Sequence, residues 1–304
     1  MTRRRVPMSR AEGPRGLVER AREFAKGGIA PAVPRDAATV ILLREAPAVE
    51  AFLLRRTEAL EFAPGACVFP GGSVDEGDAD PAIGWAGPSP AAFADRLGTS
   101  PERARALVCA AVRETFEESG VLLAGPAEPA PDAVPHDSAA LTRDRRALLG
   151  GSVSLGELLS RRGLVVRADL LTPWARWITP EISPRRFDTW FFATALPSGQ
   201  VAMLAAEAEP GSRPQPAAPG PAEPGSAESD SGTWWRPSAA LDAARAGRIT
   251  LLPPTAVTLA ELAAYQDMAG ILATRRTITP LMPEVVVEDG EPWLAMPQAT
   301  EYPI

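Results

Sequence analysis

Apolar residues follow two different spacings along the chain, and these predict strands and helices in alternation. The runs DAATVILLRE (36–45) and AVEAFLLRR (48–56) are short, aliphatic and separated by Ala46-Pro47, which predicts a pair of β-strands. Further strands are predicted at 174–178, 187–196 and 283–289, and helices at 16–26, 90–98, 101–119, 139–149, 154–162, 239–246 and 255–268. Strands interleaved with helices predict an α/β fold.

The helix expected at 101–119 carries an unusual acidic end. It starts with Ser100-Pro101 and stops at Gly120, as helix caps require. Glu114 and Glu118 fall on the same stripe as the apolar positions, and Glu117 lies to one side. One interpretation is a solvated acidic surface. However, carboxylates that face the interior are costly unless they are paired or bind metal, and oxygen ligands without His or Cys suit a hard divalent cation such as Mg²⁺. The metal interpretation is favoured.

A glycine turn precedes this helix. In CVFPGGSVDEGD (67–78) a short strand-like run ends at Pro70, and Gly71-Gly72 permit a tight turn with close backbone approach to a ligand. By itself such a turn is weak evidence for a site.

Together the two segments resemble the Nudix box, G-x5-E-x7-R-E-U-x-E-E-x-G-U, where U is a bulky aliphatic residue. Gly72 fits the first glycine, and Asp78 stands where the family has Glu. RETFEESGV (113–121) fills the second half, with Thr115 at a U position. Between Asp78 and Arg113 lie 34 residues where the family has seven. An insertion here resembles the coenzyme A diphosphatase branch of the mammalian peroxisomal type and its bacterial relatives.

The resemblance extends over roughly residues 37–265 through LLRRTEALEFAPGACVFPGG (53–72), WARWITPEISPRRFDTWFF (174–192), TWWRPSAAL (233–241) and ITLLPPTAVTLAEL (249–262). It implies a mixed sheet sandwiched between helices (α/β/α), with the box as a strand, loop and helix. It also implies Mg²⁺ or Mn²⁺ as cofactor. By resemblance, the metal ligands are Glu114, Glu117, Glu118 and the carbonyl of Gly72. Glu114 and Arg113 have catalytic roles, and Asp78, Gly71 and Gly120 support the box.

Three residues outside the box are further candidates. Glu228 lies six positions before Trp234, the spacing at which this branch carries a Glu, so it is a candidate base or ligand. The alternatives are that it is a solvated acid, or that another linker acid such as Glu207 or Glu209 serves. Arg185 and Arg186 could grip phosphates bidentately; the alternative is a surface pair beside a strand.

Composition narrows the class of protein. A net charge of −7 argues against broad binding to nucleic acid or an anionic membrane, and the sequence has no apolar run of 18 residues. Cys67 and Cys109 make no disulfide framework, and His136 is the single histidine, so His-based zinc sites are disfavoured. We expect a cytoplasmic protein that acts on a small molecule.

The expected organisation is an N-terminal tail with a short helix (1–36), a Nudix domain (37–268) and a C-terminal extension (269–304). The domain contains the insertion (79–106), expected to contribute to substrate choice, and a disordered Pro/Gly-rich linker (207–232). The leading hypothesis is hydrolysis of coenzyme A or acyl-CoA to 3′,5′-ADP and (acyl-)4′-phosphopantetheine. The alternatives are hydrolysis of another dinucleotide, such as NADH or ADP-ribose, and a non-catalytic ligand sensor.

Overall fold

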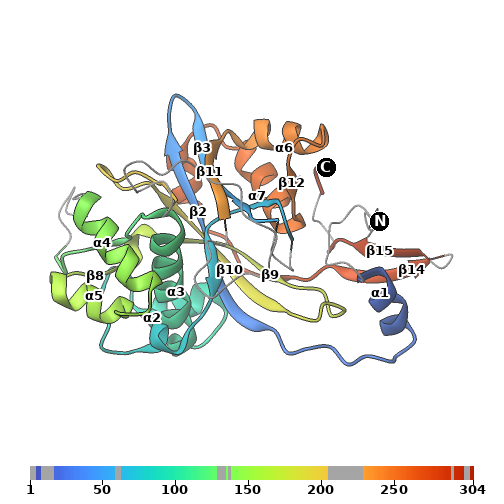
Figure 1. Ribbon diagram of the computed structural model, residues 1–304, viewed down its shortest axis with the longest axis horizontal. Coiled ribbons are helices and arrows are strands. Elements are labelled where there is room, and N and C mark those ends of the chain that lie inside the picture. Colours follow the sequence, from blue (N-terminus) through green and yellow to red (C-terminus); the bar gives the residue numbers. More distant parts are fainter. Residues whose placement is uncertain are drawn as a thin grey trace.

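A nine-stranded mixed sheet forms the centre of the molecule (Figure 1). The computed structural model describes residues 5–7, 17–58, 63–128, 135, 138–204, 229–288, 291–297 and 302–304. The strands run in the order β12-β4-β3-β2-β10-β9-β13, with β5 beside β2 and β11 beside β3. Their bounds are β2 (Arg35–Glu45), β3 (Val49–Arg56), β4 (Ala66–Val68), β5 (Gly71–Ser73), β9 (Thr172–Ile178), β10 (Phe187–Ala195), β11 (Ser229–Trp235), β12 (Thr250–Leu251) and β13 (Pro280–Leu281).

Helices cover both faces of this sheet, which confirms the predicted α/β/α arrangement. Alternate residues of β2 divide between the faces: Val40 and Leu42 pack with α3, and Ile41 and Leu43 pack with α7. Figure 1 shows one helical group at the left and a second at the top. The first comprises α2 (Pro90–Leu97), α3 (Pro101–Ser119), α4 (Ser138–Leu149) and α5 (Leu155–Arg162), and the second α6 (Pro237–Arg245) and α7 (Pro253–Ala263), with α8 (Met268–Ala273) packed on the same face.

The strands β2 and β3 form a hairpin that splits open. They pair with each other only at 43–45 and 49–51. Beyond that point β2 pairs with β5 and β3 pairs with β4, so the glycine turn lies between the separated strands. The amide of Val40 donates to the carbonyl of Pro70 at 2.8 Å where the strands part. The split hairpin therefore fixes Gly71 and Gly72 within the sheet.

The insertion (79–106) is part of the hydrophobic core. Ile83, Phe93 and Leu97 are each at most 3% exposed and pack against the α3 side of the sheet. A small sheet in the order β6-β8-β7 extends this layer. It is formed by β6 (Trp85–Ala86), β7 (Ala124–Gly125) and β8 (Val165–Arg167), and two 3₁₀ turns, η1 (Glu76–Ala79) and η2 (Ala168–Leu170), lie nearby in the chain.

Two boundaries in the C-terminal part differ from the prediction. The helix expected at 255–268 ends at Ala263, and a separate helix α8 starts after Asp267, whose side chain accepts from the amide of Gly270. Strand β11 starts at Ser229, so the last four residues of the expected linker belong to the sheet.

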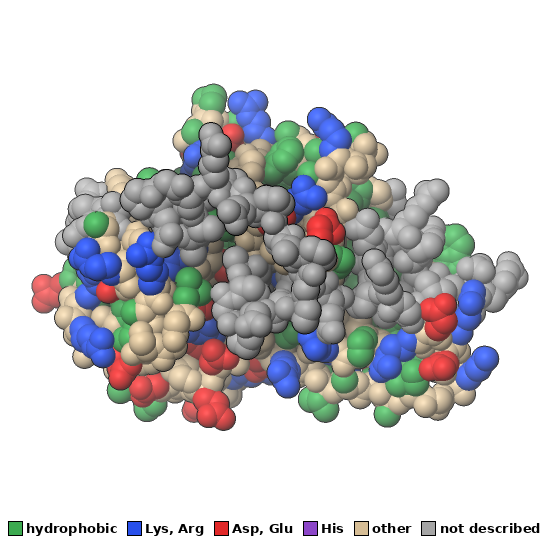
Figure 2. All heavy atoms as spheres, viewed as in Figure 1, with side chains coloured by type: hydrophobic (Ala, Val, Ile, Leu, Met, Phe, Trp, Pro, Cys, Tyr) green, Lys and Arg blue, Asp and Glu red, His purple; other side chains and the backbone are tan. Residues whose placement is uncertain are grey.

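The terminal segments form a third, antiparallel sheet in the order β1-β15-β14 beside α1 (Leu17–Ala25). Its strands are β1 (Arg5–Pro7), β14 (Glu284–Glu288) and β15 (Glu291–Ala295). No helix within the described ranges is long and apolar enough to cross a bilayer. On the face drawn in Figure 2, the described basic and acidic side chains are interspersed.

Candidate active site

Helix α3 presents its acidic residues beside the glycine turn, and both of its ends are capped. The Ser100 side chain accepts from the amide of Arg103 at 3.2 Å, and Pro101 occupies the first turn. Gly120 ends the helix with φ +74°, a left-handed conformation that glycine adopts without a steric penalty. The predicted inward stripe, including Leu107 and Ala111, is fully buried. This burial fixes the rotation of α3 and turns Glu114 toward the sheet.

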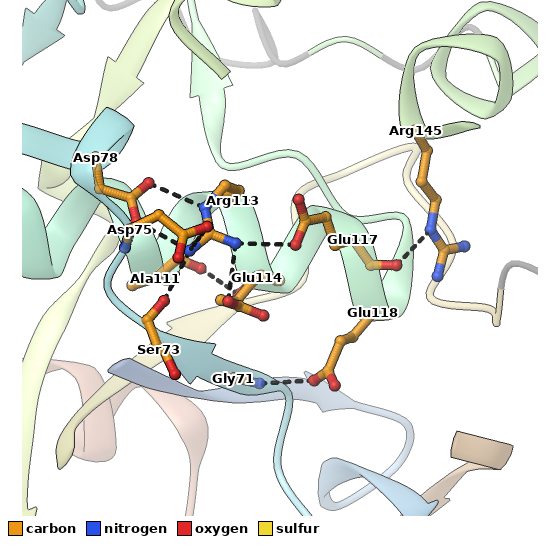
Figure 3. Close-up of polar contacts among 11 residues, drawn as sticks. Gly71, Ser73, Asp75, Asp78, Ala111, Arg113, Glu114, Glu117, Glu118 and Arg145 are labelled. Atoms are coloured by element: carbon orange, nitrogen blue, oxygen red, sulfur yellow. Dashed lines mark hydrogen bonds and ion pairs between the residues drawn. The ribbon is translucent and has the colours of Figure 1, made fainter. Parts of the chain in front are cut away.

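Arg113 is the centre of the site (Figure 3). Its side chain is buried and binds Asp78 bidentately, with Nε to Oδ1 at 3.0 Å and Nη2 to Oδ2 at 2.9 Å. Nη2 also donates to the carbonyl of Ser73 at 2.8 Å. Nη1 donates to Glu114 at 2.8 Å and to Glu117 at 3.0 Å. A single guanidinium thus joins the helix to the loop that follows the glycines.

Asp78, one methylene shorter than the family's glutamate, still reaches this arginine. The turn η1 brings it there, and Oδ2 also accepts from the amide of Asp75 at 2.8 Å. Asp78 is 1% exposed. Its two oxygens therefore accept from both Arg113 and the backbone, which fixes the carboxylate in the turn.

The two box glycines are required by close approaches. A Cβ on Gly71 would lie 2.4 Å from the carbonyl oxygen of Ala38 in β2, and one on Gly72 would lie 2.5 Å from Oε1 of Glu114. The amide of Gly71 donates to Oε2 of Glu118 at 2.7 Å. Glycine at position 71 therefore lets β2 approach the turn, and glycine at position 72 leaves space for the carboxylate of Glu114.

Negative charge exceeds positive charge around Arg113. Besides its three hydrogen-bonded carboxylates, Asp75 lies 3.5 Å from Nη2. Burial raises the pKa of Glu114 to about 7, opposed by Arg113 and reinforced by the charges of Glu117 and Asp78. Burial likewise raises the pKa of Glu117. Although burial alone would lower the pKa of Arg113, the hydrogen bonds and charges of these acids raise it, so Arg113 remains charged.

These residues fit a hard divalent cation in chemistry and charge. The side-chain donors are all carboxylate oxygens, the ligands that Mg²⁺ and Mn²⁺ favour. Glu114 and Glu117 each use one oxygen in their contacts with Arg113, and one oxygen of Glu118 accepts from the amide of Gly71. Among the described residues, no three Asp, Glu, His or Cys side chains form a ready-made metal cage. The carboxylates are instead held by Arg113 and Gly71.

The structure brings most of the predicted site residues together. They are Gly71, Gly72, Asp78, Arg113, Glu114, Glu117, Glu118 and Gly120. Arg186 corrects the prediction of a phosphate-gripping side chain. It is buried, and its guanidinium donates to the carbonyls of Thr179 and Ala32 and to the sulfur of Met282. Its donors tie chain segments together.

Two candidates keep their standing as predictions. Arg185 is exposed on the loop between β9 and β10. Glu228 lies outside the described residues, as do Glu207, Glu209 and His136.

Sequence reasoning missed one buried arginine beside the site. Arg145 of α4 is 4% exposed, and its Nε donates to the carbonyl of Glu117 at 2.8 Å (Figure 3). A signal was present, because Leu141, Arg145 and Leu148 follow helical spacing. A guanidinium on an apolar stripe predicts a buried polar partner.

Known proteins with similar sequences contain a Nudix domain. The family model NUDT19 Nudix domain matches residues 86–209, which include the acidic end of α3. Acyl-coenzyme A diphosphatase NUDT19 from Xenopus laevis is 26% identical over 246 residues, covering 70% of this chain and 59% of that protein. The Homo sapiens protein of that name is 32% identical over 190 residues, covering 49% of each chain. The chain thus matches only about half to three fifths of these two relatives.

A solved structure shares the fold. The NUDIX hydrolase from Alicyclobacillus acidocaldarius superposes with a TM-score of 0.57 at 25% identity, covering 81% of this chain and 98% of that one. The mixed sheet with its flanking helices is therefore a known architecture.

Proposed function

Because this chain belongs to the Nudix hydrolases and carries a domain of the NUDT19 type, we propose that it is a metal-dependent diphosphatase acting on coenzyme A or acyl-CoA. The products would be 3′,5′-ADP and (acyl-)4′-phosphopantetheine. The observation that carries the proposal is the cluster of carboxylates around Arg113, which lies against the glycine turn with more negative charge than its one guanidinium balances. The substrate class rests on the names of the relatives.

Hydrolysis of a diphosphate requires a water molecule to attack one phosphorus while the bridging oxygen leaves with the other. The barrier is mainly electrostatic and positional, because charge accumulates on the phosphoryl oxygens. A bound Mg²⁺ or Mn²⁺ would neutralise that charge and activate water. Glu114, Glu117 and Glu118 would hold the ion, with the carbonyl of Gly72 beside them.

The protein's own contribution is to keep these ligands in place. Arg113 restrains Glu114 and Glu117 through one nitrogen, and Asp78 fixes Arg113 in turn. Gly71 restrains Glu118. Glu228 and Arg185 are proposed additions to this set, the first as base or further ligand and the second as a phosphate contact.

The test is a substrate panel. Purified protein is incubated with CoA, acetyl-CoA, a long-chain acyl-CoA, NADH and ADP-ribose in Mg²⁺ or Mn²⁺, with EDTA controls, and the products are identified by mass spectrometry. We expect CoA or an acyl-CoA to be cleaved fastest and EDTA to abolish the reaction. Faster cleavage of NADH or ADP-ribose would replace the substrate assignment, and no turnover of any compound would favour a ligand sensor.

A further inference from the structure

Arg145, which has no role in the proposed chemistry, binds the backbone at the carboxyl end of α3. Arg145 joins three segments: its Nε donates to the carbonyl of Glu117, and its Nη1 donates to the carbonyl of Met203, both at 2.8 Å. Figure 3 shows the guanidinium reaching the helix on the side away from Gly71. The contact is to the backbone of Glu117, while the side chain of Glu117 bonds to Arg113.

The last turn of a helix leaves its final carbonyls without intrahelical partners, and donors from outside the helix bind most of them here. Three of the last four carbonyls receive donors from the Gly120 amide (to Phe116), from Arg145 (to Glu117) and from the Met203 amide (to Ser119). Arg145 is the charged donor in this set. A cation suits this end of a helix because the aligned peptide dipoles make it negative.

The surroundings are shaped to hold Arg145 and the chain that follows α3. A Cβ on Gly120 would lie 3.2 Å from Nη1 of Arg145, so this glycine provides space as well as its positive φ. Next to it, the buried amide of Gln200 accepts from the backbone amide of Leu122 at 2.8 Å and donates to its carbonyl at 3.0 Å. The segment 200–203 and the end of α3 thus form one hydrogen-bonded unit.

We propose that Arg145 is a positioning residue for the cation-binding carboxylates. By holding the last turn of α3, it keeps the carboxylates of Glu117 and Glu118 together beside the glycine turn. Glu114 lies one turn earlier and has its own contact with Arg113, so it depends less on Arg145. This inference rests on the metal site of the proposed function.

The test measures Mn²⁺ binding to the full chain, without substrate, by calorimetric titration. Loss of a group that orients metal ligands typically weakens metal binding 10- to 100-fold. We expect Arg145→Met to bind Mn²⁺ about 10-fold more weakly than the wild type, and Arg145→Lys to fall between them because a lysine reaches only one carbonyl.

Arg162→Met is the matched control. Arg162 of α5 pairs with Asp144 of α4, so the change removes a guanidinium bound to the same helix without touching α3. Its Mn²⁺ affinity should stay within about 2-fold of the wild type, because no orienting contact of the ligands is lost. Thermal unfolding of each variant, with and without Mn²⁺, separates lost stability from lost binding.

The outcomes are distinguishable. Unchanged affinity in Arg145→Met, with a lowered unfolding temperature, would make Arg145 a structural residue only and overturn the inference alone. If Arg162→Met loses as much Mn²⁺ affinity as Arg145→Met, the effect is not specific to the contact with α3, and the inference is also overturned. If Arg145→Met does not fold, wild-type affinity in Arg145→Lys overturns the inference and reduced affinity supports it. Absence of Mn²⁺ binding by the wild type would overturn the proposed metal site, and this inference with it.

Discussion

The two ends of helix α3 both carry arginine–carboxylate clusters, but their charges are balanced differently. At the amino end, Arg103 binds Asp36 and Asp188, and Arg176 binds Asp188, so two guanidinium groups face two carboxylates. Both arginines also flank the ring of Trp190, at 4.5 and 4.3 Å from its centroid. The formal charges of this cluster cancel, so it carries no net charge that would attract a cation.

At the carboxyl end, the same chemistry leaves an excess of carboxylates. Arg113 faces Asp75, Asp78, Glu114 and Glu117. Removing one acid from the amino end should therefore damage the fold, whereas removing one acid from the carboxyl end should damage function. The predictions below test this difference from the largest expected effect to the smallest.

The largest effect is expected from Glu117→Gln and Glu118→Gln. Each change removes a proposed metal ligand, and turnover should fall on the order of 100-fold, because ligands that stabilise charge in the transition state have effects of that size. Metal-free stability should be equal or higher, because repulsion among the acids is relieved. Steady-state assays with Mg²⁺ and urea unfolding in EDTA measure the two quantities. Wild-type turnover in both variants would contradict the metal assignment.

Asp188→Asn should show the opposite behaviour. Asp188 is buried and bridges Arg103 and Arg176, so its loss leaves two partly buried cations with one acid. Breaking such a pair costs about 2–4 kcal/mol, somewhat less than for a fully buried pair because Arg103 is partly exposed. Urea unfolding would show this cost, while the kcat of the protein that remains folded should stay within about 2-fold. If Asp188→Asn has normal stability but loses turnover, the amino end of α3 serves function and the proposed difference between the two ends is wrong.

A smaller effect concerns pH in the metal-free protein. The pKa of Glu114 is raised from 4.5 to about 7, so between these values the folded state holds a proton that the unfolded state has lost. Stability from this group is therefore highest below pH 4.5 and falls as pH rises toward 7, by about 1–3 kcal/mol. Glu114→Gln should reduce this slope when unfolding is measured in EDTA across that range, and the part due to the raised pKa of Glu117 should remain. An unchanged slope would place the titration elsewhere.

Local signals in the sequence were sufficient for α3 and its acidic end. Ser100, Pro101 and Gly120 mark the helix ends, and the spacing of Glu114 and Glu118 predicts that they continue the buried face. The hairpin of β2 and β3 was also predictable from two aliphatic runs. Its split was not, because the pairing of β5 with β2 depends on residues distant in sequence.

Long-range packing explains the failures. Arg185 is exposed and its neighbour Arg186 is buried. The sequence alone does not distinguish them, because the burial of Arg186 depends on how the loop before β10 folds back onto Thr179. The burial of Ile83 and Phe93 in the core was likewise not predicted, because the insertion was recognised only from its position in a family pattern.

Deleting 79–90 should prevent folding, because it removes the buried Ile83 from the core, and soluble yield and circular dichroism would show this. A folded deletion variant with altered substrate preference would instead support the predicted role of the insertion in substrate choice.

The smallest effect is expected from Asp75→Asn, which separates the number of charges from their burial. Asp75 faces the same guanidinium as Glu117, but its side chain is 67% exposed, against 17% for Glu117. Water already screens an exposed ion pair, so its removal should change the free energy of unfolding by less than about 0.5 kcal/mol. Mn²⁺ affinity should change by no more than about 3-fold, since a charge at the rim acts weakly through solvent. Glu117→Gln removes the same charge from a buried position and serves as the matched comparison. If Asp75→Asn and Glu117→Gln lose Mn²⁺ affinity equally, the total charge near Arg113 determines cation binding. Burial of the carboxylates by α3 and the glycine turn would then not be what distinguishes this end of the helix.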